Sequence, residues 1–383
     1  MKSICFVTAS FYPSIGGVET YVLHLAKKMQ QHGYRIYIIT SQLPKVATFE
    51  IYDNLHIYRF PALLLFSGRL NTILPSRRLY SFLKETILSE QAHIITNTRF
   101  YLSTILCIRF AHKHHLTAIH IEHGSGHIEM NGYFLNLLGR IYDHILGTIL
   151  QQNLNQAYGV SRASSQWLKH FGIISNGELV NAIDEKGEVS NSDFRSHLVN
   201  SNDILISYVG RITDDKGYRD LIDAFLLAYK SYPRMKLLIA GNGPQFEGMC
   251  SSISGYDHIL ALGAVPHQEV VKLLLDSDIF VFPSKCKEGM PTTVLEAGLM
   301  KCAIIATPQG GVPEVIEPEV NGLIVNPGDV MCMADSILSL VNHPDLIIQY
   351  GIKIHEKIVS QFIWTNVANK LDKVLLAINA NEK

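Results

Sequence analysis

Short apolar runs alternate with longer amphipathic stretches along the whole chain. In the first half, the runs cover residues 4–8, 36–40, 57–60, 94–96, 118–121 and 157–160. In the second half, they cover residues 204–209, 236–240, 259–262, 279–282, 303–306 and 323–325. Short runs rich in Ile and Val, separated by helical patterns, are typical of parallel strands covered on both faces. The pattern therefore predicts an α/β protein with two Rossmann-like domains that face one another.

The domain boundaries follow from where this pattern is interrupted. Residues 185–202 (EKGEVSNSDFRSHLVNSN) form the only polar stretch near the middle, and we expect a linker there. This places one domain over residues 1–184 and a second over residues 203–355. The tail, residues 356–383, is amphipathic with no strand after it, which predicts a C-terminal helix.

Composition and charge narrow the class of protein. The 383 residues are 47% hydrophobic and 17% charged, which excludes a disordered chain. Residues 1–180 carry 16 Lys and Arg against 9 Asp and Glu, whereas residues 181–383 carry 17 against 25. The net charge of −1 is thus the sum of a basic half and an acidic half. Because this total is close to zero, we expect no nucleic-acid partner. Six scattered cysteines without a CxxC pair favour reduced thiols and a cytoplasmic location.

The segment 280–300 (FVFPSKCKEGMPTTVLEAGLM) carries two carboxylates on either side of a predicted helix start. A strand ends at Phe282, Glu288 lies in the loop, and Pro291 suits the first turn of a helix that holds Glu296. The free N–H groups between the carboxylates suit a phosphate. A nucleoside diphosphate sugar, with an anionic centre and hydroxyls at both ends, would fit. By itself the spacing is as compatible with an ordinary solvated Glu296.

The segment 206–225 (ISYVGRITDDKGYRDLIDAF) places two cations after a predicted strand. Arg211 follows the strand directly, and Lys216 lies at the end of the loop. A guanidinium fork and an ammonium point charge at the carboxyl end of a parallel strand match a diphosphate. The alternative is that both are solvated loop charges paired with Asp214 and Asp215.

Glycines and histidines supply weaker signals. Gly16-Gly17 lies between the first strand and the first helix without GxGxxG spacing, so it either lets backbone approach a ligand or forms a tight turn. His123 follows the strand 118–121 and is a candidate site residue or a structural histidine. Histidines cluster at 112, 114, 115, 120, 123 and 127, but their spacing matches no usual zinc pattern, and we expect no metal site.

Taken together, these features resemble the retaining glycosyltransferases of family four, which have the GT-B fold. The similarity extends over nearly the whole chain. Besides the segments above, it includes FYPSIGGVETYVLHLAKKMQQHGY (11–34), GVSRASSQWLKHFG (159–172), LGAVPHQEV (262–270), TPQGGVPEVI (307–316) and NGLIVNPGD (321–329). The occurrence of all these motifs in this order is specific, whereas no single motif would be.

The resemblance implies how the chain is used. In that family the N-terminal domain binds the acceptor, the C-terminal domain binds the nucleotide-sugar, and the last helix packs back on the first domain. Neither a metal nor another cofactor is implied. Arg211 and Lys216 would hold the diphosphate, Glu296 would hold the ribose hydroxyls, and Glu288 would face the donor sugar at the reacting centre.

Further roles are carried over from the same resemblance. His123 would contact the sugar or assist on the acceptor side. The backbone at Gly17 and around Met290, Pro291 and Thr292 would contact sugar and phosphates, and that near Val265 and Pro266 would meet the nucleobase. The expected catalytic residues are therefore Glu288, His123, Arg211 and Lys216.

Three positions depart from the family pattern. The loop after Glu288 contains GMP instead of GFG, Lys301 stands where glycine is usual, and Ala182 replaces the glycine of a hinge segment. We expect Lys301 to require a different turn and Ala182 to stiffen the hinge. None of these changes removes an expected catalytic group.

The resemblance predicts a retaining, metal-independent hexosyltransferase. It would transfer a sugar from a UDP- or GDP-sugar to a glycan or lipid-linked acceptor, in the synthesis of a cell-surface polysaccharide such as lipopolysaccharide, capsule or exopolysaccharide. Same-face attack within an ion pair is favoured over a covalent intermediate. The alternatives are another GT-B enzyme, such as a sugar-nucleotide epimerase or a phosphorylase, and a non-catalytic subunit that binds the sugar nucleotide.

One segment suggests a membrane partner. Residues 61–87 interleave Leu, Phe and Ile with Arg69, Arg77, Arg78 and Lys84. This pattern fits a membrane-surface helix or a hydrophobic acceptor cleft, but also an ordinary core helix with basic flanks. We expect no membrane-spanning helix, because no apolar run approaches the ~18 residues that one needs. The prediction is peripheral association with the anionic inner face of the cell membrane.

Overall fold

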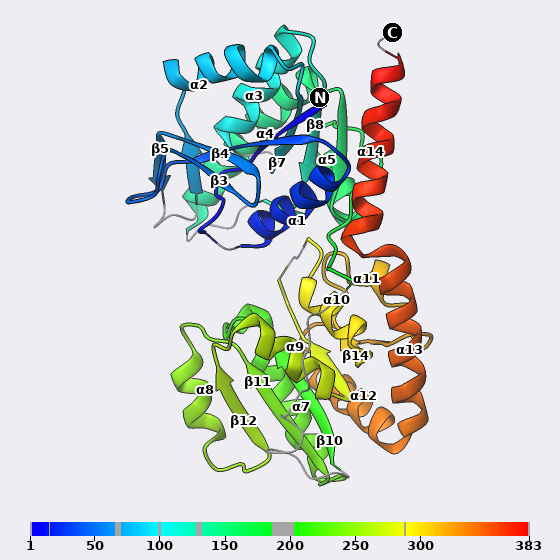
Figure 1. The fold of residues 1–383 in the computed structure, drawn as a ribbon. Coiled ribbons are helices and arrows are strands. Elements are labelled where there is room, and N and C mark those ends of the chain that lie inside the picture. The colour runs from blue at the N-terminus through cyan, green and yellow to red at the C-terminus, as the bar shows by residue number, and fades with distance from the viewer. Residues whose placement is uncertain are drawn as a thin grey trace. The chain divides into compact units, whose positions relative to one another are not determined.

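The computed structural model describes residues 2–14, 16–65, 70–98, 101–127, 132–185, 203–286 and 289–381. Two compact units are present (Figure 1). Unit 1 comprises Met1–Asn181 and Trp364–Lys383, and unit 2 comprises Ala182–Ile363. Of the predicted linker 185–202, all but Glu185 lies outside the described residues. The tail expected over 356–383 divides: residues up to Gln361 end a helix of unit 2, and a separate helix of unit 1 begins at Trp364.

Unit 1 contains a seven-stranded sheet in the order β3-β4-β2-β1-β7-β8-β9. All neighbouring strands pair in parallel except β3, which is antiparallel to β4. The strands are β1 (Ser3–Val7), β2 (Arg35–Ser41), β3 (Phe49–Tyr52), β4 (Leu55–Phe60), β7 (His93–Asn97), β8 (Ala118–Glu122) and β9 (Gln156–Gly159). All six strands predicted in this half are confirmed, and β3 is an additional edge strand.

Helices cover both faces of this sheet (Figure 1). They are α1 (Gly17–Gln31), α2 (Arg77–Phe82), the π-helix η1 (Leu83–Leu88), α3 (Leu102–Lys113), α4 (Tyr133–Asn153), α5 (Arg162–Lys169) and α14 (Trp364–Asn381). The helices α2, α3 and α4 bury apolar side chains against one face. On the other face α14 packs on α1, where the indole of buried Trp364 meets the ring of Tyr21 edge-on at 5.1 Å.

For residues 61–87 the two helical interpretations, a membrane-surface helix and a core helix, are wrong for the first half of the segment. Residues Ala62–Leu65 (β5) and Leu70–Ile73 (β6) form an antiparallel hairpin, and only the residues from Arg77 onward are helical. Pro75 and the N-cap Ser76 separate the two parts. The apolar side chains of the helical part, Leu79, Phe82, Leu83 and Ile87, are buried in the core of unit 1. This part therefore follows the core-helix alternative.

Unit 2 contains a six-stranded parallel sheet in the order β12-β11-β10-β13-β14-β15. Its strands are β10 (Ile204–Val209), β11 (Met235–Ala240), β12 (Ile259–Gly263), β13 (Ile279–Phe282), β14 (Ala303–Ala306) and β15 (Leu323–Ile324). Its helices are η2 (Asp214–Lys216, 3-10), α7 (Tyr218–Tyr229), α8 (Phe246–Ile253), α9 (His267–Asp276), α10 (Thr292–Leu299), α11 (Val312–Val315), α12 (Val330–Asn342) and α13 (Pro344–Gln361). All six predicted strands are confirmed.

Each sheet has a point at which the strand order reverses. In unit 1 the chain runs outward from β1 through β2 on one side and continues at β7 on the other; in unit 2 the same happens between β10 and β13. Open parallel sheets bind ligands at the carboxyl ends of the strands at this switch point, because loops on either side diverge there. The two switch points are therefore where site residues are expected to gather.

The turn after α10 corrects one expectation from the sequence. Lys301 adopts a left-handed conformation with φ 65°, and its N–H donates to the carbonyl of Gly298. The chain thus keeps the turn that favours glycine, and the expectation of a different turn is wrong. Ala182 is buried, and its effect on a hinge stays a prediction. No helix among the described residues has the length and apolar character needed to cross a bilayer.

Candidate active site

In unit 2 the two predicted cations lie on the loop that follows β10 at the switch point. Arg211 is exposed, and Lys216 ends the short helix η2. Gly217 is the N-cap of α7 with φ 72°, and a Cβ there would lie 2.0 Å from the carbonyl oxygen of Pro283. This glycine therefore lets the Arg211–Lys216 loop approach the loop after β13.

Hydrogen bonds connect the same two loops. The backbone N–H groups of Lys285 and Cys286 donate to the carbonyl of Asp215 at 2.8 and 3.2 Å. The carboxylate of Asp214 accepts from Arg219 at 2.7 Å and is also bonded to Gln245. Asp214 therefore pairs with Arg219 and not with Arg211. The alternative of paired loop charges agrees with Lys216, whose charge acts on Asp215. Hydrogen bonding from Thr213 and the charge of Lys216 lower the pKa of Asp215, although partial burial opposes them.

The loop from β13 to α10 is held on its other side by the loop after β14. The N–H of Gly311 donates to the carbonyl of Gly289 at 2.7 Å, and the hydroxyl of Thr307 donates to Ser284 at 2.6 Å. Met290 is buried against Gly311, where a Cβ would lie 2.4 Å from the Met290 methyl. These contacts hold Ser284 before, and Gly289 and Met290 after, the part of the loop that lies outside the described residues. Glu288 lies outside the described residues.

The N-terminus of α10 presents first-turn amides at the switch point. Pro291 is the N-cap with φ −72°, so it precedes the first turn instead of lying within it as expected, and Thr292 is the first helical residue. The first N–H groups of any α-helix have no carbonyl partner inside the helix and carry the positive end of its dipole. This end of α10 is therefore suited to a phosphate or a sugar oxygen.

Glu296 faces a histidine that sequence reasoning left without a role. It lies in the second turn of α10, and its carboxylate Oε1 is 3.2 Å from Nε2 of His267 at the start of α9. The hydrogen bond and the negative charge of Glu296 raise the pKa of His267, and partial burial opposes this. Val265 and the N-cap Pro266 immediately precede His267, so the predicted nucleobase and ribose contacts lie on adjoining segments. The sequence could have indicated His267 as a site residue, because it directly follows Val265 and Pro266, which were already expected to contact the nucleobase.

In unit 1, the first helix begins at the carboxyl end of the central strand β1. Gly17 is its first residue, after the N-cap Gly16 with extended backbone. The carboxyl of Glu19 lies over this turn, because a Cβ on Gly16 would be 2.4 Å from its Oε2. Burial raises the pKa of Glu19. Sequence reasoning gave Glu19 no role, although its position three residues after the N-cap is where an acidic side chain can reach back over the helix start.

His123 lies two strands away on the same edge, directly after β8. Its Nε2 is 3.0 Å from Oδ1 of Asn97, the last residue of β7, and its ring meets Tyr21 edge-on at 4.7 Å. Desolvation lowers the pKa of His123 to about 3; the charge of Glu122 opposes this shift, and His120 adds to it. The imidazole is therefore neutral at physiological pH, with Nε2–H donating to Asn97 and Nδ1 left as an acceptor.

The comparisons with known proteins cover both units. Residues 15–179 match the model for Glycosyltransferase Family 4, and residues 189–354 match the model for Glycosyl transferases group 1. An uncharacterized glycosyltransferase of Methanocaldococcus jannaschii is 25% identical over 95% of both chains. The GPI3 subunit of phosphatidylinositol N-acetylglucosaminyltransferase from Saccharomyces cerevisiae is 24% identical over 99% of this chain and 83% of its own length.

A solved structure shows the same architecture. Anabaena HepE in complex with UDP is similar with a TM-score of 0.76 at 16% identity, over 98% of this chain and 100% of that one. This chain is a family-four glycosyltransferase. Its fold is the GT-B fold, as the family resemblance implied, and its two parallel sheets agree with the strand pattern.

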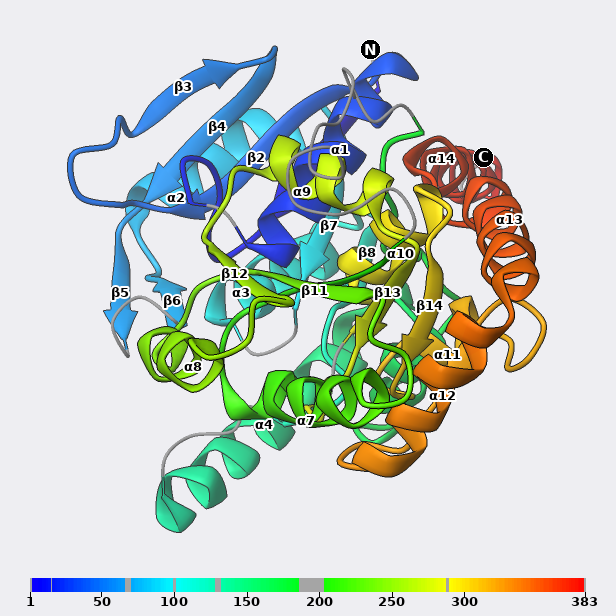
Figure 2. The ribbon, with the colours of Figure 1, turned by 90° about the horizontal axis from the view of Figure 1, so that it is seen from below.

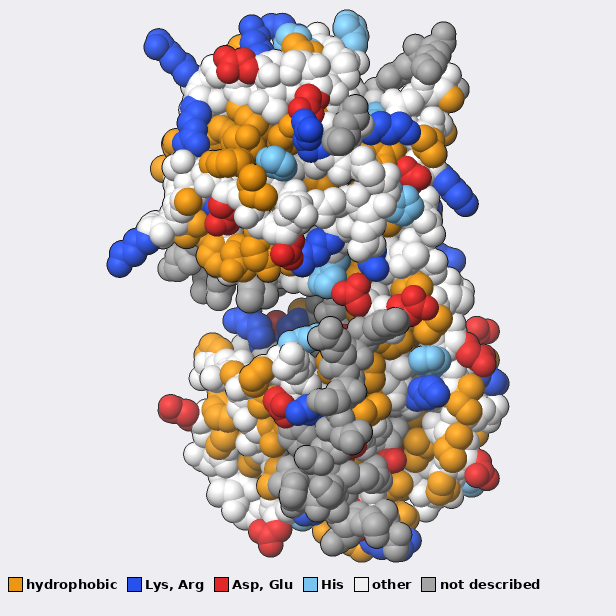
Figure 3. Space-filling model, viewed as in Figure 1, with side chains coloured by type: hydrophobic (Ala, Val, Ile, Leu, Met, Phe, Trp, Pro, Cys, Tyr) orange, Lys and Arg blue, Asp and Glu red, His pale blue; other side chains and the backbone are white. Residues whose placement is uncertain are grey.

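The charge of the transferase is divided between its units. Lys and Arg side chains project from unit 1, the unit that holds the N-terminus, in the view of Figure 3. The sequence totals of +7 for residues 1–180 and −8 for residues 181–383 agree with this picture. Arg211 and Lys216 are thus local cations within the acidic half, placed by the fold at a strand end.

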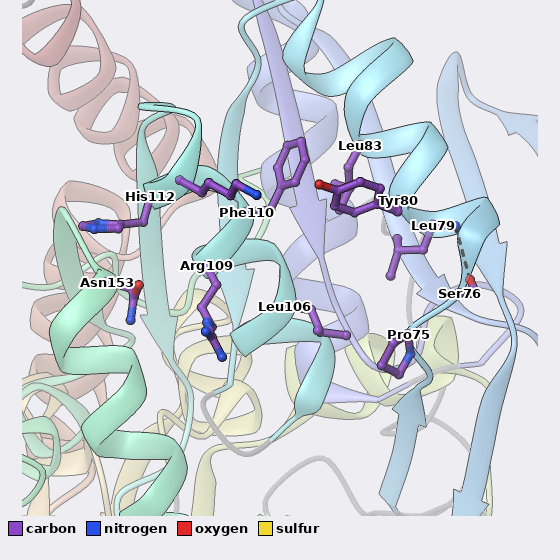
Figure 4. A pocket seen from close by; sticks show the side chains of 11 residues that line it. Pro75, Ser76, Leu79, Tyr80, Leu83, Leu106, Arg109, Phe110, His112 and Asn153 are labelled. Carbon is purple, nitrogen blue, oxygen red and sulfur yellow. Dashed lines mark hydrogen bonds between the residues drawn. The ribbon is translucent and has the colours of Figure 1, made fainter.

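A pocket of about 400 Å³ in unit 1 lies away from these residues. Its walls come from α2, η1, α3 and the end of α4, and Figure 4 shows Leu79, Leu83 and Leu106 around it with Arg109 beside them. Arg109, His112 and Lys113 lie near the C-terminus of α3, which returns to the amino edge of a parallel sheet. The pocket therefore belongs to the opposite edge from His123 and Gly17.

We predict that the pKa of His267 lies above its ordinary value of 6.5 and returns toward it in Glu296→Gln. The protonated ring is stabilised by the carboxylate, so the interaction is present at low pH and lost as the pH rises through the raised pKa. An NMR titration of labelled histidine measures it. Glu269→Gln, which removes a carboxylate from the same helix as His267, is the control and should change nothing. An unchanged His267 pKa in Glu296→Gln would contradict the pairing.

Proposed function

We propose that this glycosyltransferase moves a hexose-type sugar from a UDP- or GDP-sugar to a glycan or lipid-linked acceptor, with retention and without a metal ion. The observation that carries the proposal is the grouping of cations and a helix start at one switch point. Arg211 and Lys216 follow β10, and the N-terminus of α10 follows β13, the strand paired with β10. Glu296 on α10 supplies a carboxylate for ribose hydroxyls.

The electrostatic reason concerns the leaving group. When the bond between the anomeric carbon and the phosphate oxygen breaks, the electron pair stays on the oxygen and the diphosphate gains negative charge. Fixed cations and helix N–H groups stabilise that charge without reorganising during the reaction. Arg211, Lys216 and the first-turn amides of α10 would supply this stabilisation, a role that Mg²⁺ fills in other enzymes.

We favour attack on the same face of the sugar. The acceptor hydroxyl oxygen forms the new bond to the anomeric carbon on the side that the diphosphate leaves, and its proton passes to the departing phosphate oxygen. No enzyme nucleophile is needed, and Glu288 would position or stabilise the sugar. In unit 1, Gly17 and His123 are the residues that we propose to contact the substrates.

The state of His123 limits what it does in this scheme. A neutral ring whose Nε2–H is bonded to Asn97 offers Nδ1 as a hydrogen-bond acceptor, so it would hold a sugar hydroxyl. It carries no positive charge at neutral pH and therefore does not help to neutralise the diphosphate. Its role is to orient the donor sugar or the acceptor.

UDP-N-acetylglucosamine is the first donor to test. The yeast relative is named for N-acetylglucosamine transfer to phosphatidylinositol, and the similar Anabaena structure contains UDP. A lipid-linked acceptor agrees with the first name and with the basic charge of residues 1–180. We further propose a cytoplasmic enzyme that acts peripherally at the membrane in cell-surface polysaccharide synthesis.

Helix α4 is the surface that we propose to meet the membrane. Phe134, Leu138, Ile141 and Ile145 are 47–68% exposed and recur at helical spacing, so they form one apolar stripe. Leu135, Leu137 and Tyr142 flank it and are also exposed. In Figure 2 the first turns of α4 extend clear of the neighbouring elements. This stripe replaces residues 61–87 as the membrane-facing element, because Leu79, Phe82, Leu83 and Ile87 in the helical part of that segment are buried in the core.

We predict that UDP raises the apparent melting temperature of the transferase and that GDP, ADP and dTDP raise it less. A ligand that binds only the folded protein stabilises it by mass action. Differential scanning fluorimetry without added metal measures the shift. A larger increase in melting temperature with GDP would indicate that the donor is a GDP-sugar. An unchanged melting temperature with every nucleotide would contradict the proposed donor site.

We predict that Arg211→Ala and Lys216→Ala each lower kcat roughly a hundredfold or more, as expected for loss of one fixed donor to a developing charge. Release of UDP and the anomeric configuration of the product, both followed by NMR in the presence of EDTA, measure the effect. Arg234→Ala, which removes an exposed cation of unit 2 just before β11, is the control.

Each outcome of that experiment has a meaning. An unchanged kcat in both loop variants would contradict the leaving-group role. A product in which the sugar remains on the nucleotide would favour the epimerase alternative, and absence of any transfer would favour the non-catalytic subunit.

We predict salt-sensitive binding to vesicles of phosphatidylglycerol and phosphatidylcholine. Replacing Phe134, Ile141 and Ile145 together with Ser should abolish it, because the stripe supplies the buried apolar area. Ile174→Ser removes an apolar side chain that is 84% exposed elsewhere in unit 1, and should leave binding intact. Sedimentation that is equal for the triple variant and wild type would exclude α4 as the contact.

A further inference from the structure

Three histidines that are far apart in the sequence meet in unit 1. His127 follows β8, His144 lies on α4, and His170 follows the end of α5. The ligand nitrogens of all three lie within 4.8 Å of one another. Among the described residues, this is the one group of three or more potential metal ligands that approach so closely. The group shares only His127 with the run of histidines seen in the sequence.

A buried carboxylate orients the first of these rings. Oδ2 of Asp143 accepts a hydrogen bond from Nδ1 of His127 at 2.8 Å, and Asp143 is 3% exposed. Protonation of Nδ1 leaves Nε2 of the same ring with its lone pair. Histidines that bind metals commonly donate their other N–H to a carboxylate, which fixes the tautomer and strengthens the ligand. This bond is an observation separate from the approach of the three rings.

Aromatic side chains pack against the other two rings. The indole of Trp167 stacks on His170 with centroids 4.7 Å apart and planes inclined by 10°. Phe171 packs against His144 with centroids 5.2 Å apart. His144 and His170 are both exposed, so an ion has a path from solvent to the group.

We propose that His127, His144 and His170 bind a divalent transition-metal ion of the Zn²⁺ class. Three imidazoles with a water molecule complete a tetrahedral zinc site. Zinc–nitrogen bonds of about 2.0–2.1 Å bring the nitrogens of such a site to about 3.4 Å from one another. The two exposed rings close the remaining distance by side-chain rotation. Imidazole ligands favour Zn²⁺, Cu²⁺ and Ni²⁺ over Mg²⁺ and Ca²⁺, which prefer oxygen ligands.

The bound ion ties three segments of unit 1 together. It connects the loop after β8 to α4 and to the end of α5, and this loop begins with His123, four residues before His127. None of the three ligands has a role in the proposed transfer. The ion is therefore structural and does not act as a Lewis acid in the reaction. Binding to the folded state alone stabilises unit 1.

The test is a zinc titration of tag-free protein that has been treated with EDTA, kept reduced and followed by calorimetry. Wild type is expected to bind one ion per chain. The double variant His144→Gln/His170→Gln, which changes only exposed side chains, is expected to lose this event. Asp143→Asn is expected to weaken it about 10–100-fold, because the tautomer of His127 is no longer fixed.

His343→Gln removes an exposed histidine of unit 2 and is the matched control. Because this variant changes only one surface histidine, it also measures how strongly the other histidines and the six cysteines bind zinc. Visible absorption of the Co²⁺ form gives an independent signature, present in wild type and the control and absent from the double variant. Equal zinc affinity in the double variant and the control, or no one-to-one binding in wild type, would overturn the proposal.

Discussion

The parallel pairing of one central strand with neighbours on both sides is the constraint on which the rest of the structure depends. In unit 2, β10 pairs with β11 on one side and with β13 on the other. Because the pairing is parallel, the loops after β10 and β13 leave from the same edge. Backbone hydrogen bonds between Asp215 and the 285–286 segment then join the two loops. The cations and the start of α10 come together for this reason.

Unit 1 repeats the arrangement with different chemistry. Its central strand β1 leads to Gly17 and Glu19, and β7 and β8 lead to Asn97 and His123. Here burial favours the neutral forms: it lowers the pKa of His123 and raises that of Glu19. In unit 2, by contrast, Arg211 is exposed to solvent. The strand ends of unit 1 thus carry a partly buried imidazole and a partly buried carboxyl, whereas those of unit 2 carry cations.

The hydrophobic pattern correctly predicted the parallel strands that lie buried within the two main sheets. All twelve predicted strands occur, because parallel strands covered on both faces are continuously apolar. It failed at residues 61–87, where β5 and β6 form a small hairpin outside the main sheet and Pro75 and Ser76 end the extended part. It also missed β3, whose alternating half-exposed side chains resemble a loop. Lys301 shows that an unfavourable residue is tolerated where neighbouring contacts impose the turn.

The sequence by itself determined the fold class, the strand positions and the residue types at the strand ends, because these depend on local patterns and short motifs. Only the tertiary structure decided which strand ends are neighbours, since strand order depends on long-range pairing. It joined Glu296 to His267 and brought His127, His144 and His170 together from three segments. Such groups depend on crossover connections that no local pattern encodes.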